Sequence, residues 1–291
     1  MPHMEHYQLA RDIALPATPT MFRGVHRSLA VRAKSLLGWL IFRTRLYRLL
    51  LRGRGVIVVF HRVNDNYPDD PITCTRAEFE RYLRFFSKFF DVVPLTELLD
   101  RLKKGVDLGS TLTITFDDGY KGNATTAAPI LERHGLRACF FVATGFIGTH
   151  RIPWWDEQSG ITTQWMTWDD VRALRAAGHE IGSHTATHAN LGVVVGEEAR
   201  REIRAGQALL EAELGESSGL FAYPYGARKN FAEANRQIPK ELGLRCNVAA
   251  FGGTVSAGDD PFALKRTSIT RWIRSPYQFG FELVRGHLEQ D

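Results

Sequence analysis

The chain has 291 residues and a formal net charge of +5; 44% of its residues are hydrophobic and 24% are charged. This composition is typical of a globular protein with a sizeable core, and it excludes a wholly disordered chain, a collagen-like chain and a disulfide-stapled miniprotein. No apolar run approaches the ~20 residues of a membrane-spanning helix, which argues against an integral membrane protein. Three cysteines without a C-x-x-C spacing predict neither a disulfide framework nor a thiolate metal site.

The basic excess is confined to the start of the chain. Residues 1–55 hold ten Lys/Arg against two acidic residues, a net charge of +8, whereas the remainder carries −3. We therefore expect residues 1–54 to form a basic, partly helical extension and residues 55–291 to form the main domain. A nucleic-acid-binding protein more often spreads its basic residues over a folded face, so no nucleic-acid partner is expected.

One helix is expected over residues 29–52 of this extension, with an apolar peak at 36–42. If it is projected at 100° per residue, Arg32 and Arg43 share a face. Four other basic residues lie nearly opposite: Lys34, Arg45, Arg48 and Arg52. Since no single polar face results, three roles stay open for residues 23–54: peripheral contact with an anionic membrane, packing on the domain, or binding a partner. Without a clear cleavable signal, a cytoplasmic or inner-membrane-peripheral location is expected rather than secretion.

From residue 56 onward, apolar runs of strand character alternate with segments of helical periodicity. Strands are expected at 56–60, 92–93, 111–116, 138–143, 180–184, 220–223 and 245–251. Helices are expected at 76–90, 95–104, 124–134, 167–177 and 197–214. The alternation predicts an α/β fold with a parallel sheet and right-handed crossovers, either open or closed into a barrel.

Polar residues follow several of these strands at the point where the apolar run ends. His61 follows the first strand, Asp117 and Asp118 follow the strand at 111–116, and His184 and Tyr225 follow two later strands. Because ligands bind beyond the carboxyl ends of parallel strands, we expect these side chains to lie on one face of the fold.

Two of these positions have the residue types of a metal centre. Asp117 and Asp118 are neighbours on an extended segment, so one carboxylate could bind a metal while the other faces water or substrate. A simple Asp-Gly turn is the alternative. His184 and His188 are four residues apart and could share one ion. Asp118 completes a His-His-carboxylate set that leaves coordination positions open, as is typical of a catalytic metal site.

Aromatic residues supply further candidates. The segment Pro224-Tyr225-Gly226 ends a strand, and a backbone N–H exposed there could donate to an oxyanion; an ordinary aromatic strand end is the alternative. Three tryptophans could stack on sugar rings, with packing against the domain as the alternative: Trp154, Trp155 and Trp168.

The T-F-D-D-G stretch at 115–119, the H-T-A-T-H stretch at 184–188 and the P-Y-G stretch at 224–226 resemble, in order, three motifs of a known family. They resemble those of the polysaccharide deacetylases with a NodB-homology domain, carbohydrate esterase family four. Within that family, the motif pattern is most similar to that of the biofilm-polysaccharide deacetylases. The resemblance implies a distorted (β/α)7 barrel, a divalent metal that is commonly zinc, and an acetylated amino-sugar polymer or glycoconjugate as substrate.

The same resemblance implies roles for individual residues. Asp118, His184 and His188 would hold the metal, Asp117 would be the general base, and Tyr225 would offer its backbone N–H to the oxyanion, with Pro224 beside the substrate.

The chain departs from the family pattern at two points. The arginine expected two residues before Pro224 is Ala222, and the late region lacks the L-x-H motif that carries the family's general acid. His61, in a Phe-His pair like that of the biofilm-type deacetylases, is the candidate acid, and Arg266 is the candidate to orient Asp117. A structural histidine and an ordinary ion pair are the alternatives.

The sequence thus predicts a metal-dependent hydrolase that removes N-acetyl groups from an amino-sugar glycan. Two other functions stay open: an O-acetyl esterase or other amide hydrolase on the same fold, and a non-catalytic carbohydrate-binding protein.

Overall fold

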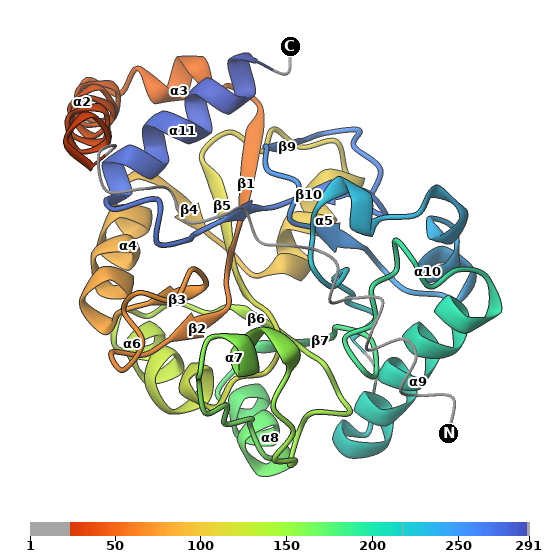
Figure 1. The fold of residues 1–291 in the computed structure, drawn as a ribbon. Coiled ribbons are helices and arrows are strands. Elements are labelled where there is room, and N and C mark those ends of the chain that lie inside the picture. The colour runs from red at the N-terminus through yellow and green to blue at the C-terminus, as the bar shows by residue number, and fades with distance from the viewer. Residues whose placement is uncertain (1–23, 217, 290–291) are drawn as a thin grey trace.

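The computed structural model describes residues 24–216 and 218–289, and the side chains from residue 29 onward. Residues 1–23 of the expected basic extension lie outside this described part. Figure 1 shows the strands in the middle of the molecule, with helices around them.

Four consecutive parallel strands form the main part of the sheet: β1 (Arg54–Phe60), β5 (Thr111–Phe116), β6 (Cys139–Val142) and β7 (Glu180–Ser183). On its other edge β1 pairs in parallel with β11 (Thr267–Ser268). The strands are buried on both faces, which explains their continuous β-branched and aromatic character. The predicted strands at these positions are confirmed, whereas β11 was not predicted.

The sheet curls beyond β7 until it returns to β1. Phe221 forms a single bridge to β7, and Ala222 forms one to β8 (Val248–Ala249). β8 pairs in parallel with β10 (Leu264–Lys265), and only Arg266 separates β10 from β11, which lies against β1. These pairings make a curled, distorted α/β barrel, as the family resemblance implied. The strands expected at 220–223 and 245–251 are wrong in extent, because only isolated bridges and the two residues of β8 pair there.

Four minor strands complete the ladders: β2 (Arg62–Val63) with β3 (Thr73–Cys74), β4 (Asp91–Val92) against β5, and β9 (Val255–Ser256) antiparallel to β1.

The larger helices lie where the sequence predicts them, within two residues at either end. They are α4 (Arg76–Phe89), α5 (Leu95–Lys103), α8 (Trp168–Ala176) and α9 (Glu197–Leu214). The helix expected at 124–134 is a π-helical turn, η2 (Asn123–Ala127), followed by α6 (Ala128–Arg133). Five helical segments were not predicted: α7 (Trp154–Gln158), η3 (Arg228–Asn230), η4 (Glu233–Asn235), α10 (Ile238–Glu241) and α11 (Pro276–Leu288).

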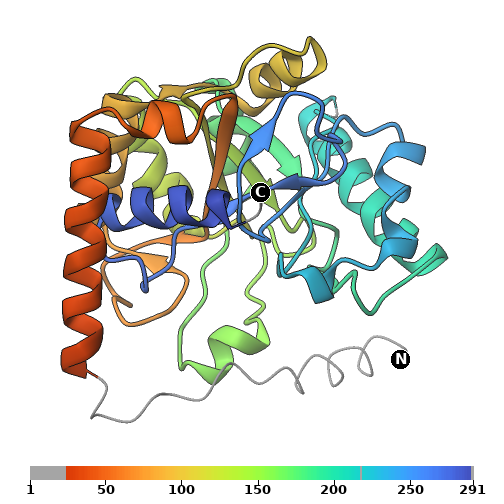
Figure 2. The ribbon, with the colours of Figure 1, turned by 90° about the horizontal axis from the view of Figure 1, so that it is seen from above.

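The single helix expected at 29–52 is wrong. The chain forms α2 (Gly24–Arg43) and α3 (Tyr47–Leu50), separated by a turn at Arg45, whose φ is 63°. α2 runs along one edge of the molecule beside α11 (Figure 2). None of the helices in the described part of the chain has both the length and the hydropathy needed to cross a membrane.

Strand alternation separates two cores and aims the functional residues. Val58 and its even-numbered neighbours pack outward against the helices, whereas Ile57, Phe141 and Leu264 pack together inside the barrel. Successive strand residues point to opposite faces, so the odd-numbered positions of β5 face inward. Asp117, directly after β5, continues this inward series at the end of the barrel where the strands finish.

Candidate active site

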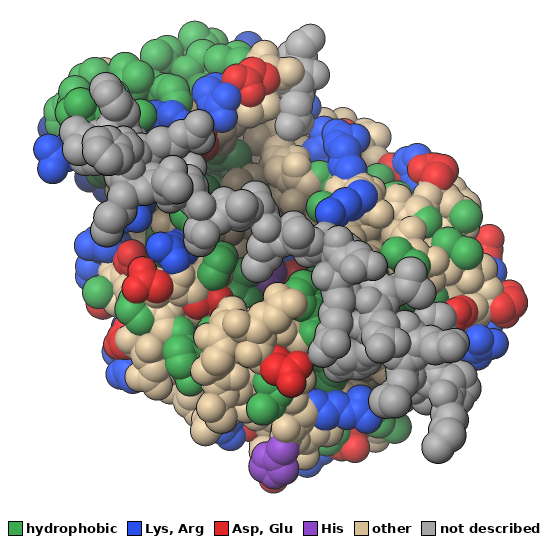
Figure 3. Space-filling view, viewed as in Figure 1, with side chains coloured by type: hydrophobic (Ala, Val, Ile, Leu, Met, Phe, Trp, Pro, Cys, Tyr) green, Lys and Arg blue, Asp and Glu red, His purple; other side chains and the backbone are tan. Residues whose placement is uncertain are grey.

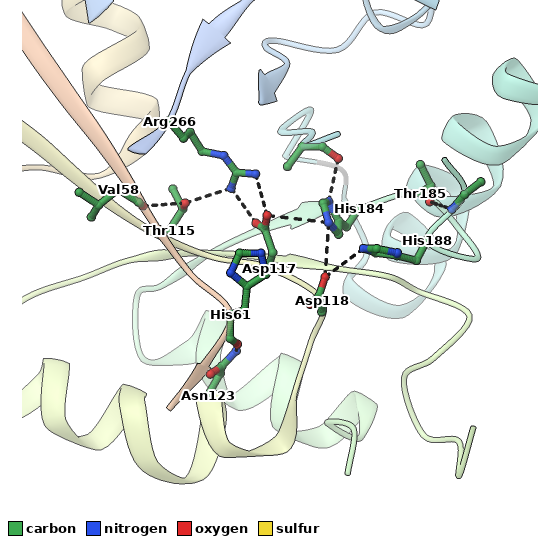
Figure 4. A network of polar contacts seen from close by, with 12 residues as sticks. Val58, His61, Thr115, Asp117, Asp118, Asn123, His184, Thr185, His188 and Arg266 are labelled. Carbon is green, nitrogen blue, oxygen red and sulfur yellow. Dashed lines mark hydrogen bonds and ion pairs between the residues drawn. The ribbon is translucent and has the colours of Figure 1, made fainter. Parts of the chain in front are cut away.

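Asp118, His184 and His188 meet at the carboxyl ends of β5 and β7. Asp118 Oδ1 lies 3.5 Å from His184 Nε2 and 3.2 Å from His188 Nε2, and all three residues are buried. One ligand atom from each residue lies within 4.8 Å of the others. Figure 4 shows the three side chains pointing toward one another. The fold therefore brings together the three metal ligands expected from the sequence.

Backbone strain accompanies this convergence. In the described part of the chain, six non-glycine residues have a positive φ, and four of them belong to this site: Asp118, Thr185, His188 and Tyr225. Such conformations cost of order 1–3 kcal/mol each and persist only where the surrounding structure imposes them. The strand ends are thus turned sharply to present these side chains.

The protonation states suit a metal ligand set. His184 Nδ1 donates to the Ala222 carbonyl oxygen at 2.8 Å, so its Nε2 presents a lone pair to the site. Burial lowers the pKa of His184 to about 4, which keeps the imidazole neutral at pH 7. Burial alone would raise the pKa of Asp118, but the neighbouring His188 and the other two imidazoles hold it well below the usual range.

An orphaned oxygen gives a direct test of whether these residues fit a cation. Asp118 Oδ1 is buried and has no hydrogen-bond donor, although two imidazole nitrogens lie within 3.5 Å. Three potential ligand atoms therefore converge on one point, and Asp118 Oδ1 forms a hydrogen bond to neither imidazole. A divalent metal ion satisfies such a set, and the two-histidine, one-carboxylate composition leaves positions open for water and substrate.

Asp117 is held by Arg266. The guanidinium donates to Asp117 Oδ1 at 2.7 Å and Oδ2 at 2.6 Å, and to Thr115 Oγ1 at 3.1 Å. Burial alone would raise the pKa of Asp117, but Arg266 and His184 outweigh it and lower the pKa below its ordinary value. Asp117 is therefore an ionised carboxylate in a fixed orientation, 3.8 Å from His184 Nε2.

His61 lies beside the two aspartates (Figure 4). Its backbone oxygen accepts a hydrogen bond of 2.7 Å from Asn123 Nδ2, and its ring Nδ1 is buried without a partner. The fold thus places an imidazole next to Asp117 and Asp118 from the side of β1. Its role as general acid stays a prediction.

Aromatic side chains form a wall on the side of His188. The Trp155 ring lies 4.8 Å from the His188 ring, and the Tyr225 ring lies 4.6 Å from it. Trp154 Nε1 donates to the Tyr225 hydroxyl at 3.4 Å, and Pro224 is buried beneath this segment. Trp168 lies elsewhere: it packs on α8 against the outer core. The fold brings Trp154 and Trp155 to the site and leaves Trp168 away from it.

Sequence reasoning placed Asp156 beside the two tryptophans but missed the contacts by which it and Arg62 anchor this wall. Arg62 Nη2 donates to both carboxylate oxygens of Asp156, at 2.6 and 2.7 Å, and its guanidinium lies 4.2 Å from the centre of the Tyr120 ring. The Tyr120 hydroxyl accepts a hydrogen bond of 2.8 Å from Trp155 Nε1. The only local signal was the position of Arg62 directly after His61 and of Asp156 directly after the tryptophan pair.

The chain matches the family model for polysaccharide deacetylase over residues 104–246, and it belongs to that family. The motif resemblance is confirmed, and the chain is an enzyme of this family with an Asp-His-His metal-binding triad. Over 138 residues it is 34% identical to a chitooligosaccharide deacetylase of Azorhizobium caulinodans. That match spans 47% of this chain and 56% of the relative.

Two solved structures share the fold. Deacetylase PplD of Streptococcus pyogenes, solved in complex with acetate, has a TM-score of 0.65 at 19% identity, over 78% of this chain and 96% of that one. IcaB from Ammonifex degensii has a TM-score of 0.64 at 23% identity, over 76% of this chain and 94% of that one.

Proposed function

We propose that this enzyme removes N-acetyl groups from an amino-sugar polysaccharide or glycoconjugate, with zinc as its divalent metal. The observation that carries the proposal is the position of the ionised Asp117 beside the convergent ligand set of Asp118, His184 and His188. Two imidazoles and one carboxylate are a ligand set that zinc takes in catalytic sites.

Each side chain has a task in such a hydrolysis. The metal, when bound, would supply Lewis-acid activation of water and of the acetyl carbonyl. Asp117 accepts the proton of the attacking water, and Arg266 fixes the carboxylate for that transfer. The backbone N–H of Tyr225 donates to the oxygen on which negative charge develops. His61 donates a proton to the leaving amine, which would otherwise depart as an unstable anion.

The surroundings of the site support a carbohydrate substrate. A polar pocket of about 260 Å³ is lined in part by Arg62 and Tyr120, the two residues that anchor the aromatic wall. Hydroxyl and amide side chains line this pocket, among them Asn64, Thr125 and Gln164. Such groups match the hydroxyls of a sugar, whereas aromatic faces match its apolar side. The name of the A. caulinodans relative, a chitooligosaccharide deacetylase, agrees with an N-acetylated sugar.

The test is acetate release from N-acetylglucosamine oligomers and polymers by protein that has been stripped with a chelator and reloaded with zinc. We expect turnover only after reloading. Asp117→Asn should lower turnover by about 10²–10⁴-fold while zinc content stays unchanged, because the general base is lost and the ligands remain.

Two outcomes would contradict the proposal. Acetate release from O-acetylated xylan alone would identify an O-acetyl esterase. Tight binding of the N-acetylated polymer by zinc-loaded protein without any acetate release would identify a carbohydrate-binding protein.

A further inference from the structure

We propose that the outward face of α2, α3 and the turns that join and follow them docks on an anionic lipid surface. Seven large apolar side chains of this docking surface are exposed: Leu29, Leu36, Leu37, Trp39, Leu40, Leu46 and Leu49. Five exposed arginines accompany them: Arg32, Arg43, Arg45, Arg48 and Arg52. Figure 3 shows hydrophobic side chains gathered over this corner of the molecule, with basic side chains at their margin.

The inner face of α2 already has its partner in α11. Lys34 Nζ lies 2.6 Å from Glu282 Oε1, and the hydroxyls of Ser35 and Ser275 lie 2.8 Å apart. Phe42 is fully buried against Gly280 of α11. These contacts hold α2 on the domain by one face only. The leucines of the docking surface are therefore not needed for the fold.

The exposed stripe of α2 is apolar along its length. Leu29, Leu36 and Leu40 fall within about 40° of one another at 100° per residue, and Arg32 and Arg43 lie on one flank of this stripe. Leu36 is 59% exposed. Contiguous apolar surface of this kind, flanked by charge, marks an interaction site rather than an ordinary protein surface.

The helix break at Arg45 removes the argument against membrane binding that the projection of one continuous helix gave. On one continuous helix, the basic residues after Arg43 would lie opposite to Arg32. In the structure α2 ends at Arg43, and the later arginines come from the turn and from α3, where Leu49 is 68% exposed. Exposed arginines and exposed leucines therefore lie close together on both α2 and α3.

The positive charge of the docking surface favours an anionic lipid surface over a second copy of the chain as its partner. Residues 24–54 contain eight Lys/Arg and no Asp/Glu. No carboxylate among the described residues pairs with Arg32, Arg43 or Arg45. In a twofold dimer through this face the same arginines would confront one another, which costs energy. On an anionic membrane, by contrast, leucines and Trp39 enter the acyl boundary while the guanidiniums reach the headgroups.

The placement of α2 keeps the site accessible. α2 lies along one edge of the molecule, while α7, which carries Trp154 and Trp155, lies at another (Figure 2). Docking through α2 would therefore leave the carboxyl ends of the strands free to receive a glycan.

The test is co-sedimentation of the full chain with vesicles of phosphatidylcholine containing about 30% phosphatidylglycerol, compared with phosphatidylcholine alone. We expect binding to the anionic vesicles that weakens as salt rises. Arg32→Glu/Arg43→Glu should weaken this binding by at least about tenfold, since each basic residue contributes about 1 kcal/mol near such a surface. Leu36→Ser/Leu40→Ser should weaken it at low and high salt alike.

Matched variants control for net charge and for lost apolar surface. Lys103→Glu/Lys104→Glu, at an exposed site on α5 and its end, makes the same charge change and should retain binding. Val193→Ser/Val195→Ser removes two valines that are 54% and 50% exposed and should also retain it. Equal loss in these controls, or equal binding to neutral vesicles, overturns the proposal. So does a dimer that Leu36→Ser/Leu40→Ser dissociates, if the wild-type chain ignores the vesicles.

Discussion

Arg266 lies 149 positions after Asp117 in the chain, yet its two terminal nitrogens grip the two carboxylate oxygens of that aspartate at 2.6 and 2.7 Å. Both residues point into the barrel, and Arg266 is fully buried between β10 and β11. The third motif has Ala222 at the position where the family resemblance leads one to expect an arginine. The guanidinium thus comes from the junction of β10 and β11, where the barrel returns to β1.

Arg266→Lys should lower kcat by about 10–100-fold with KM and zinc content unchanged. Lysine keeps the charge but cannot form two parallel bonds, so Asp117 loses its fixed orientation rather than its ionisation. Steady-state kinetics on an N-acetylated glycan checks this. An unchanged kcat would mean that Arg266 only balances a buried charge.

His61→Ala should lower turnover by about 10²–10⁴-fold while zinc binding is retained, because proton donation to the leaving amine is lost. His150→Ala is the matched control, since His150 is exposed. Metal analysis and kinetics on the same samples separate the roles. If His61→Ala turns over like the wild type, His61 takes no part in the reaction.

His188→Ala should lose bound zinc and, with it, the thermal stabilisation that zinc gives to the wild-type chain. A ligand present at 100 times its dissociation constant stabilises the native state by about 2.7 kcal/mol. Melting curves with and without zinc measure this difference. The variant should melt alike in both, whereas His150→Ala should respond as the wild type does.

Asp156→Ala should lower the free energy of unfolding by about 3 kcal/mol. The change leaves the buried Arg62 without its main partner, and breaking a buried pair costs far more than losing an exposed one. It should also raise KM, because Asp156 ties α7 and Trp155 to β2. Denaturant unfolding and kinetics check both effects.

The control for this prediction is Asp169→Ala, which removes an exposed pair with Arg172 and should cost less than about 1 kcal/mol. Equal costs for the two variants would show that Arg62 finds another partner when Asp156 is lost.

Local sequence was sufficient for the metal ligands. Asp118 and His184 each follow an apolar strand in a parallel sheet, and parallel strands end at one edge, so their meeting could be predicted without coordinates. The main helices were equally predictable from their helical periodicity, and in the structure Thr75 and Thr167 begin two of them with capping boxes. The short strands after residue 245 were not, because two-residue ladders leave no periodic pattern.

What the sequence by itself determined is therefore the alternation of strands and helices and the meeting of the ligand triad, because both depend on neighbours in the chain or on strand order. Only the tertiary structure decided between an ordinary ion pair and the paired bonds from Arg266 to both oxygens of Asp117, and it alone showed that Arg62 and Asp156 anchor Trp155 and that Trp168 packs against the outer core. It also decided that the helix at 29–52 breaks at Arg45. These outcomes depend on which side chains, far apart in the sequence, pack together in the folded chain. The residue pattern along the sequence does not specify those contacts.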